Sequence, residues 1–159
     1  MSGLRTITSN TRAETMSINM TDRDRLDMAN DMIKYKKGTM RGFRRGGQIA
    51  KKRIKQLIKN PPKTGKKYRR LPNRSSQGGE APAFQSGVLF RSADYSVFRW
   101  DYLAVGVTVL YGKFLEYGTK KPNGRTIMEP RPFVSRGCEE TFQTVKIALS
   151  MGIDEELNK

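Results

Sequence analysis

Apolar and small residues recur at steps of three and four, or sums of these, between Thr21 and Lys59, which is the stripe of an amphipathic helix. Thr21, followed by Asp22 and Asp24, supplies the hydroxyl cap and first-turn carboxylates of a helix start. The prolines within residues 60–62 stop any helix. A long helix from 21 to 59 is therefore predicted. The positions of its stripe are Leu26, Ala29, Ile33, Met40, Phe43, Ala50, Ile54, Leu57 and Ile58.

Four glycines, Gly38, Gly42, Gly46 and Gly47, interrupt this predicted helix. Each costs about 1 kcal/mol relative to alanine inside a helix, so we expect a kink or break near residues 38–47. Three of them are spaced by four, which would make a groove for another helix. A flexible joint is an equally good interpretation, and both stay open.

After Gly87 the pattern changes to period two, which predicts two strands over residues 95–100 and 103–110 that meet in a tight hairpin at Asp101 and Tyr102. Residues 88–91 fit a short strand or a helical turn, and residues 126–128 fit a further edge strand of an antiparallel sheet.

A last helix is predicted with Pro132 in its first turn and Gly152 at its end. Cys138 lies on its apolar stripe, which makes it a buried small residue and not a nucleophile. The stripe comprises Val134, Cys138, Phe142, Val145, Ala148 and Leu149.

These elements predict an α+β fold: a small antiparallel β-sheet flanked by a long N-terminal helix and a C-terminal helix, with a long basic loop or hairpin arm at residues 60–87. We expect residues 1–20, rich in Ser, Thr and Asn, to form a flexible tail, and residues 21–159 to form one domain.

The charge is strongly uneven. The chain has 31 Lys and Arg against 15 Asp and Glu, a formal net charge of +16. Between Asp31 and Glu80 there are 17 bases and no acid, which leaves 14 bases and 15 acids elsewhere. Such a segment favours a polyanionic partner, nucleic acid or an acidic protein surface, over a merely solubilising face.

Several kinds of chemistry are excluded. With no histidine and a single cysteine, an internal disulfide and the usual zinc, haem and triad sites are out of reach. The carboxylates Glu116, Glu129, Glu139 and Glu140 lack a partner for acid or base work. We therefore expect no enzyme activity, metal or cofactor. No stretch approaches the roughly 20 apolar residues that a bilayer requires, so we expect a soluble protein made in the cytoplasm, without a membrane partner.

Residues 63–74 combine cations with one aromatic side chain that fits stacking on a base only weakly, so phosphate or carboxylate contact is the firmer expectation. PKTGKKYRR, from Pro62, lacks the first glycine, strand and helix of a phosphate-binding loop. The candidate partner-binding residues are Lys63, Lys66, Lys67, Tyr68, Arg69, Arg70 and Arg74.

Four short motifs occur in one order: PPKTGKKYRR from Pro61, GEAPAFQSGVL from Gly79, YGKFLEYGT from Tyr111 and PRPFV from Pro130. Together they resemble the tail-completion, or head-tail joining (neck), proteins of long-tailed double-stranded DNA bacteriophages, the family represented by the gene-10 product of a lambdoid siphophage. The resemblance covers about residues 45–150.

The resemblance implies a structural virion protein that forms a ring, a hexamer or dodecamer, at the head-to-tail junction. Its implied partners are copies of itself, the head connector or adaptor proteins and the tail tube or tail terminator proteins, with packaged DNA in the channel as a further contact. The implied locations are the virion neck and, during assembly, the host cytoplasm. A nucleic-acid-binding module, such as a DNA-packaging accessory or ribosome-associated protein, is the alternative that the charge supports.

The motif at Tyr111 also has a physical interpretation. Tyr111, Phe114, Leu115 and Tyr117 predict one helical turn packed under the sheet, ended by a glycine at 118. Glu116 is expected to pair with a base such as Arg131, either within the subunit or across a subunit boundary. The candidate subunit-interface residues are Tyr111, Glu116, Tyr117 and Arg131.

Overall fold

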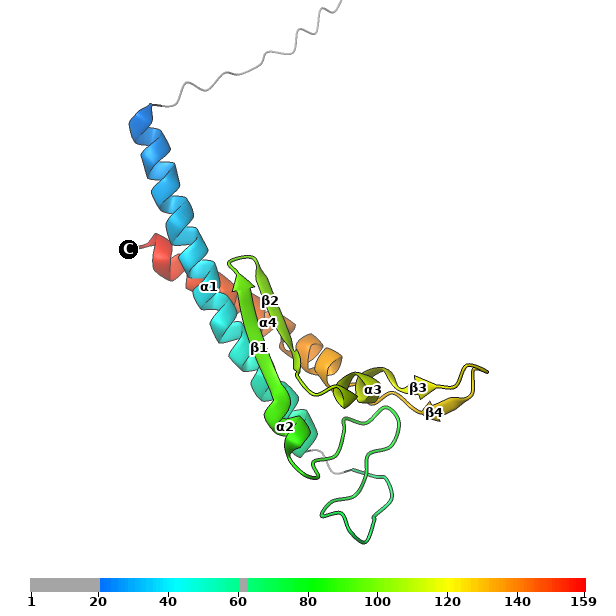
Figure 1. The fold of residues 1–159 in the computed structure, drawn as a ribbon. Helices are drawn as coiled ribbons and strands as arrows, with labels where there is room; N and C mark the ends of the chain where they lie inside the picture. The colour runs from blue at the N-terminus through cyan, green and yellow to red at the C-terminus, as the bar shows by residue number, and fades with distance from the viewer. Residues whose placement is uncertain (1–20, 61–62) are drawn as a thin grey trace, which may run out of the picture.

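The computed structural model describes residues 21–60 and 63–159, so the predicted tail at 1–20 lies outside the described residues. The fold is α+β, as predicted: a long N-terminal helix, two-stranded antiparallel sheets and a C-terminal helix (Figure 1). The elements are α1 (Asp22–Lys59), α2 (Val88–Ser92), β1 (Ala93–Arg99), β2 (Tyr102–Val107), α3 (Tyr111–Tyr117), β3 (Thr119–Lys120), β4 (Thr126–Met128) and α4 (Val134–Leu157).

Helix α1 begins with the predicted cap. The backbone N–H of Asp24 donates to the Thr21 hydroxyl at 3.2 Å, and the Asp24 carboxylate accepts the Thr21 N–H at 3.0 Å, so the pair forms a capping box. The helix then runs unbroken to Lys59, and the expected break near 38–47 is wrong.

The glycines of α1 form the groove that was one of the two sequence interpretations, and α4 lies in it. A Cβ added to Gly42 would lie 2.6 Å from the Cα of Leu149, and one added to Gly38 would lie 2.7 Å from the carbonyl oxygen of Gly152. Because these neighbours are backbone atoms, only glycine allows the two helices to approach so closely. Packing against α4 thus offsets the low helix propensity of the glycines.

Helix α4 differs from its prediction at both ends and on its buried face. It starts at Val134, after Pro132, and continues through Gly152 to Leu157. The expected end at Gly152 is wrong because that glycine packs on Gly42 of α1. Phe142, assigned to the buried stripe, is 55% exposed. The buried positions are Gly137, Thr141, Ala148, Gly152 and Glu156, and four of these five are small residues that allow the close approach to α1.

Strands β1 and β2 form the predicted hairpin, with Tyr95 opposite Val105 and Val97 opposite Leu103. In Figure 1 the hairpin runs along α1. Gly47 makes room there, since a Cβ at this position would overlap the Tyr95 ring. The predicted strand at residues 126–128 is β4, but it pairs with β3 in a second sheet and is not an edge of the first.

The hydrophobic core lies where α1, α2, β1 and the start of α4 meet. Ile54, Ile58 and Phe133 are its largest fully buried side chains. Leu57, Ala81, Leu89 and Ala93 complete it, and Cys138 packs against it half-buried, in keeping with a structural role.

Candidate interaction surfaces

Residues 63–87 form a loop that is tied to itself and to the body. The Gly65 N–H donates to the Ser75 carbonyl at 2.9 Å, and the Ser75 N–H donates to the Lys66 carbonyl at 3.0 Å, so residues 65–75 close a small hairpin-like turn. The Asn73 side-chain amide donates to the Phe84 carbonyl at 2.7 Å. Ser76 is buried, whereas the distal residues 66–74 are all exposed.

Three of the candidate cations hold this loop in shape. The Lys63 ammonium donates to the Leu57 carbonyl at 3.0 Å, and burial lowers its pKa. The Lys67 ammonium donates to the carbonyls of Leu71 and Pro72, which closes the turn from 67 to 72. The Arg74 guanidinium reaches the Gly65 carbonyl at 3.5 Å.

The other four candidates are free to meet a partner. Lys66, Arg69 and Arg70 are exposed, and no carboxylate of residues 21–60 or 63–159 lies within 4.0 Å of their charged nitrogens. Tyr68, between them, is 51% exposed. We call residues 66–70 the arm tip.

A second basic projection was missed by the sequence reasoning. The β3–β4 hairpin carries exposed Lys120, Lys121 and Arg125, and turns at Gly124 with φ 81°. The Asn-Gly pair flanked by bases was the signal that would have located it. Its base adjoins the loop, because the Gly79 N–H donates to the Pro130 carbonyl at 2.8 Å. Both project from the end of the molecule opposite the start of α1 (Figure 1).

Glu116 has an internal role as the N-terminal cap of α4. Its carboxylate accepts the backbone N–H groups of Phe133, Val134 and Ser135 at 2.9–3.0 Å and the Ser135 hydroxyl at 2.6 Å. Burial by itself would raise the pKa of Glu116, but these hydrogen bonds outweigh it and lower the pKa. A negative charge at a helix N-terminus also suits the helix dipole.

The expected pair of Glu116 with Arg131 does not occur among the described residues. Arg131 instead donates its backbone N–H to the Leu115 carbonyl at 2.7 Å, and its Nε is buried without a hydrogen-bond partner. Glu116 and Arg131 therefore belong to neighbouring, hydrogen-bonded segments, but their side chains have different surroundings.

The aromatic residues of α3 are exposed, and the expectation that they pack in the core is wrong. Tyr111, Phe114 and Tyr117 are 42%, 46% and 80% exposed. Only Leu115 of this group packs against the core, and Gly118, with φ 71°, follows the helix as predicted. The amphipathic turn thus has one buried aliphatic contact and leaves its rings available to a partner.

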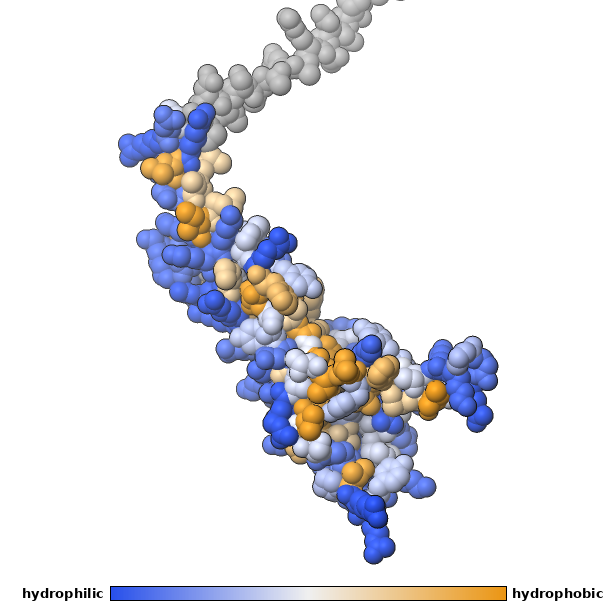
Figure 2. Space-filling model, in the orientation of Figure 1, coloured by the Kyte–Doolittle hydropathy of each residue, from blue (hydrophilic) through white to orange (hydrophobic). Residues whose placement is uncertain are grey.

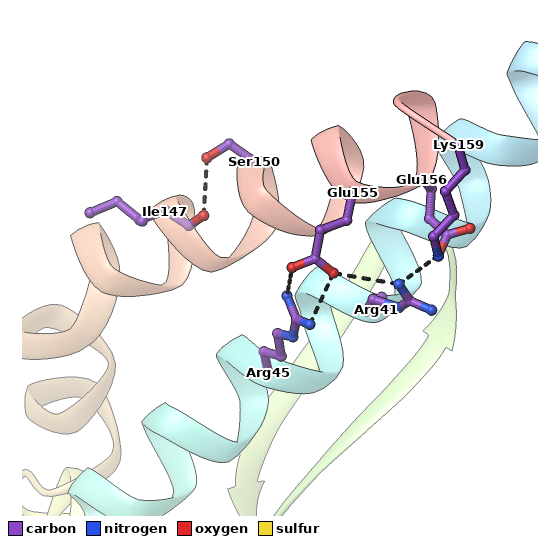
Figure 3. Close-up of polar contacts among 7 residues, drawn as sticks. All are labelled: Arg41, Arg45, Ile147, Ser150, Glu155, Glu156 and Lys159. Atoms are coloured by element: carbon purple, nitrogen blue, oxygen red, sulfur yellow. Dashed lines mark hydrogen bonds and ion pairs between the residues drawn. The ribbon is translucent and has the colours of Figure 1, made fainter.

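Acids of α4 neutralise part of the basic segment. The Arg45 guanidinium makes two bonds to the Glu155 carboxylate, at 2.6 and 3.0 Å, and Arg41 lies 2.7 Å from Glu156 (Figure 3). Hydrogen bonds from Arg45 lower the pKa of Glu155. Further along, Arg53 binds Glu140 at 2.5 Å. The positive charge of the basic segment is therefore not uniform, because some of its bases are neutralised by acids of α4 and others have no acidic partner among the described residues.

The first turns of α1 extend beyond the body (Figure 1). Leu26 is 61% exposed, and Met28, Met32 and Ile33 are also more than half exposed. Figure 2 shows hydrophobic side chains along this projecting part. We call residues 22–34 the α1 tip. An apolar face left uncovered on a helix is typical of an interaction site.

No protein-family model, curated protein or solved structure matches this chain. Within residues 21–60 and 63–159, no helix has the length and apolar character needed to span a membrane. The same part of the chain contains no group of three or more Cys, Asp or Glu side chains placed to hold a metal ion.

Proposed function

We propose that the chain is a structural virion protein of the phage neck, which forms a ring that completes the tail end and joins it to the head connector. The observation that carries this proposal is that three segments bearing the family resemblance, at 79–89, 111–119 and 130–134, pack into one unit although they are far apart in sequence.

Each segment contacts another through named atoms. The Gly79 N–H bonds to the Pro130 carbonyl, and the Arg131 N–H bonds to the Leu115 carbonyl. Glu116 caps the helix that begins after Phe133. Segments that contact one another in the fold must keep their order and spacing in the sequence. The contacts therefore support treating the three motifs as a single pattern.

The distribution of charge suits a joining role. Three free cations of the arm tip and three of the β3–β4 hairpin project from the same end of the molecule. Cations on exposed turns attract an acidic surface and set the rate of encounter. Repetition around a ring multiplies such weak contacts into a firm joint with the head connector or the tail.

The test removes only the free charges of the arm tip. In the phage that encodes the chain, Lys66→Gln, Arg69→Gln and Arg70→Gln are combined, while Lys67 is kept because it closes the loop. We expect a folded protein but separate full heads and complete tails in electron micrographs.

A matched control removes the same charge elsewhere, at the exposed positions Arg44→Gln, Arg91→Gln and Lys146→Gln. We expect the control phage to join heads and tails. Normal yields of infectious particles from the arm-tip variant would show that these cations do not join heads to tails.

Nucleic-acid binding is the second candidate, favoured by the exposed Tyr68 among free cations. It predicts tight binding of duplex DNA or RNA at physiological salt, with a steep fall in affinity as salt rises. If the chain is a neck protein, we expect it to bind duplex DNA or RNA only weakly at physiological salt, with an affinity that Tyr68→Ala does not change. Tight binding that Tyr68→Ala reduces about tenfold or more would favour the second candidate.

A further inference from the structure

The α1 tip carries an acidic edge beside its apolar face. Asp24, Asp27 and Asp31 follow each other at steps of three and four, so they lie along one line of the helix. Met28 and Met32 lie on the neighbouring line, displaced by one residue. The tip has four acids against three bases, Arg23, Arg25 and Lys34, whereas residues 35–59 of the same helix have ten bases and no acid.

A groove of matching character lies on the body of the same chain. It has a volume of 1210 Å³ and follows α1 between Arg45 and Asn60, with α2 and β1 on one side and α4 on the other. Ile49 lies on its floor, Phe90 borders one side, and Ile147 and Met151 of α4 border the other. Both α4 residues are more than half exposed, so the groove offers apolar area that this copy does not cover.

Three lysines in the groove have no acid of their own. Lys52, Lys55 and Lys59 line it, and no carboxylate within the described part of the chain lies within 4.0 Å of their ammonium groups. Their neighbours Arg45 and Lys51, by contrast, are paired with Glu155 and Asp94. The three lysines follow each other at steps of three and four, the same spacing as the three aspartates of the tip.

We propose that the α1 tip of one copy of this chain lies in the lysine-lined groove of a second copy. The proposal rests on the proposed ring and specifies its contact between neighbours. Apolar side chains of the tip meet apolar side chains of the groove, and Asp27 and Asp31 meet lysines that have no carboxylate partner among the described residues. The lengths also agree: the 13 residues of the tip span about 20 Å, and the α1 floor of the groove spans about 22 Å.

A chain cannot place its tip in its own groove. Leu26 and Ile49 belong to one continuous helix, and the 23 residue steps from one to the other separate the two by about 35 Å. The contact therefore joins two different patches of neighbouring copies, tip to groove. A contact of this head-to-tail kind generates a ring when its rotation closes.

Cross-linking between single cysteines tests the contact directly. In full-length chains that carry Cys138→Ser, Leu26→Cys is placed in one chain and Ile147→Cys in another, both at exposed positions. With a short bis-maleimide at high protein concentration and low salt, the mixture should give a cross-linked dimer at several times the yield of either chain alone.

The control pairs Leu26→Cys with Phe98→Cys, an exposed position near the end of β1 that does not line the groove. We expect little product from it. Absence of the 26–147 product, or equal yields from 98 and 147, would overturn the proposed contact.

Charge reversal tests the complementarity. Asp27→Lys with Asp31→Lys, and separately Lys52→Glu with Lys55→Glu, should each reduce cross-linking between the marked sites at least tenfold. A chain that carries all four changes in both cysteine partners should recover most of the yield. Circular dichroism of each chain checks that it folds, and failure of the four changes to restore the product would refute a charge-matched contact.

The outcomes separate this contact from the neck role. If the cross-link fails while the arm-tip variant still leaves heads and tails unjoined, the contact is wrong and the neck role stands. If the cross-link forms while the arm-tip variant joins heads and tails normally, the self-association stands and the joining role of the arm tip is wrong.

Discussion

The close approach of α1 and α4 makes Gly42→Ala the most informative single change for the fold. A Cβ at this position would lie 2.6 Å from the Leu149 Cα and 2.9 Å from the Ala148 carbonyl oxygen. Ordinary contact begins at 3.4 Å, so the helices must separate by nearly 1 Å, and neither neighbour is a side chain that can rotate away.

Two opposing free energies set the size of the effect. Alanine is favoured over glycine in a helix by about 1 kcal/mol. Overpacking costs about 1–3 kcal/mol, and the upper end applies where backbone meets backbone. We therefore expect a net loss of about 2 kcal/mol in the free energy of unfolding, roughly a 30-fold change in the unfolding equilibrium.

Urea unfolding, followed by circular dichroism and by the fluorescence of Trp100, measures this loss. Gly106→Ala in β2 is the control, because a Cβ there meets nothing within 4 Å, and its stability should not fall. A Gly42→Ala chain as stable as the native chain, or more stable, would show that helix propensity decides and that the glycine contact is not as close as described.

Three further predictions follow from single groups. Glu116→Gln weakens the cap of α4 and should cost about 1–2 kcal/mol at neutral pH. Folding lowers the pKa of Glu116, so its contribution to the free energy of unfolding is present above the usual pKa of 4.5 and is lost as the pH falls through the folded pKa. The free energy of unfolding should therefore fall less steeply with decreasing pH in the variant than in the native chain. Burial raises the pKa of the Cys138 thiol, so its reaction with a thiol reagent at pH 8 should be about tenfold faster after unfolding; equal rates would contradict its packing. Limited trypsin digestion should cut first at Arg69 and Arg70 and later at Lys63, whose ammonium is half-buried and bonded; mass spectrometry of the fragments shows the order.

Local sequence signals correctly predicted the features that depend only on interactions between residues close together in the chain. The cap at Thr21, the stop after Lys59 and the hairpin turn between β1 and β2 all agree with the structure. Each rests on residues within a few positions of one another, where hydroxyl capping, proline geometry and side-chain alternation decide the backbone.

Contacts between distant segments decided the features that were mispredicted. Glycine is typical of a helix C-terminus, so a helix end was expected at Gly152. In the structure Gly42, 110 residues earlier, packs on Gly152 and the helix continues. Glu116 was expected to pair with a base such as Arg131, and only the fold brings its carboxylate under the start of α4. Tyr117, also a candidate interface residue, was expected to pack under the sheet in a single helical turn, but other side chains fill the core and its ring is exposed.

At the candidate site, too, some features were visible in the sequence and others depend on contacts between distant segments. The cations of residues 63–74 were visible in the sequence, but their separation into loop-holding and free groups required the hydrogen bonds of Lys63 and Lys67. The groove is assembled from α1, α2, β1 and α4, so no local pattern marks it.

The proposed neck role is tested most directly by electron cryo-microscopy of phage particles whose head-to-tail junction is expected, on this proposal, to contain the chain. The account predicts a closed ring of copies of this chain between the head connector and the tail, with the α1 tip of each copy against α1 and α4 of its neighbour. A junction built entirely from other proteins, with this chain absent from the finished particle, would contradict it.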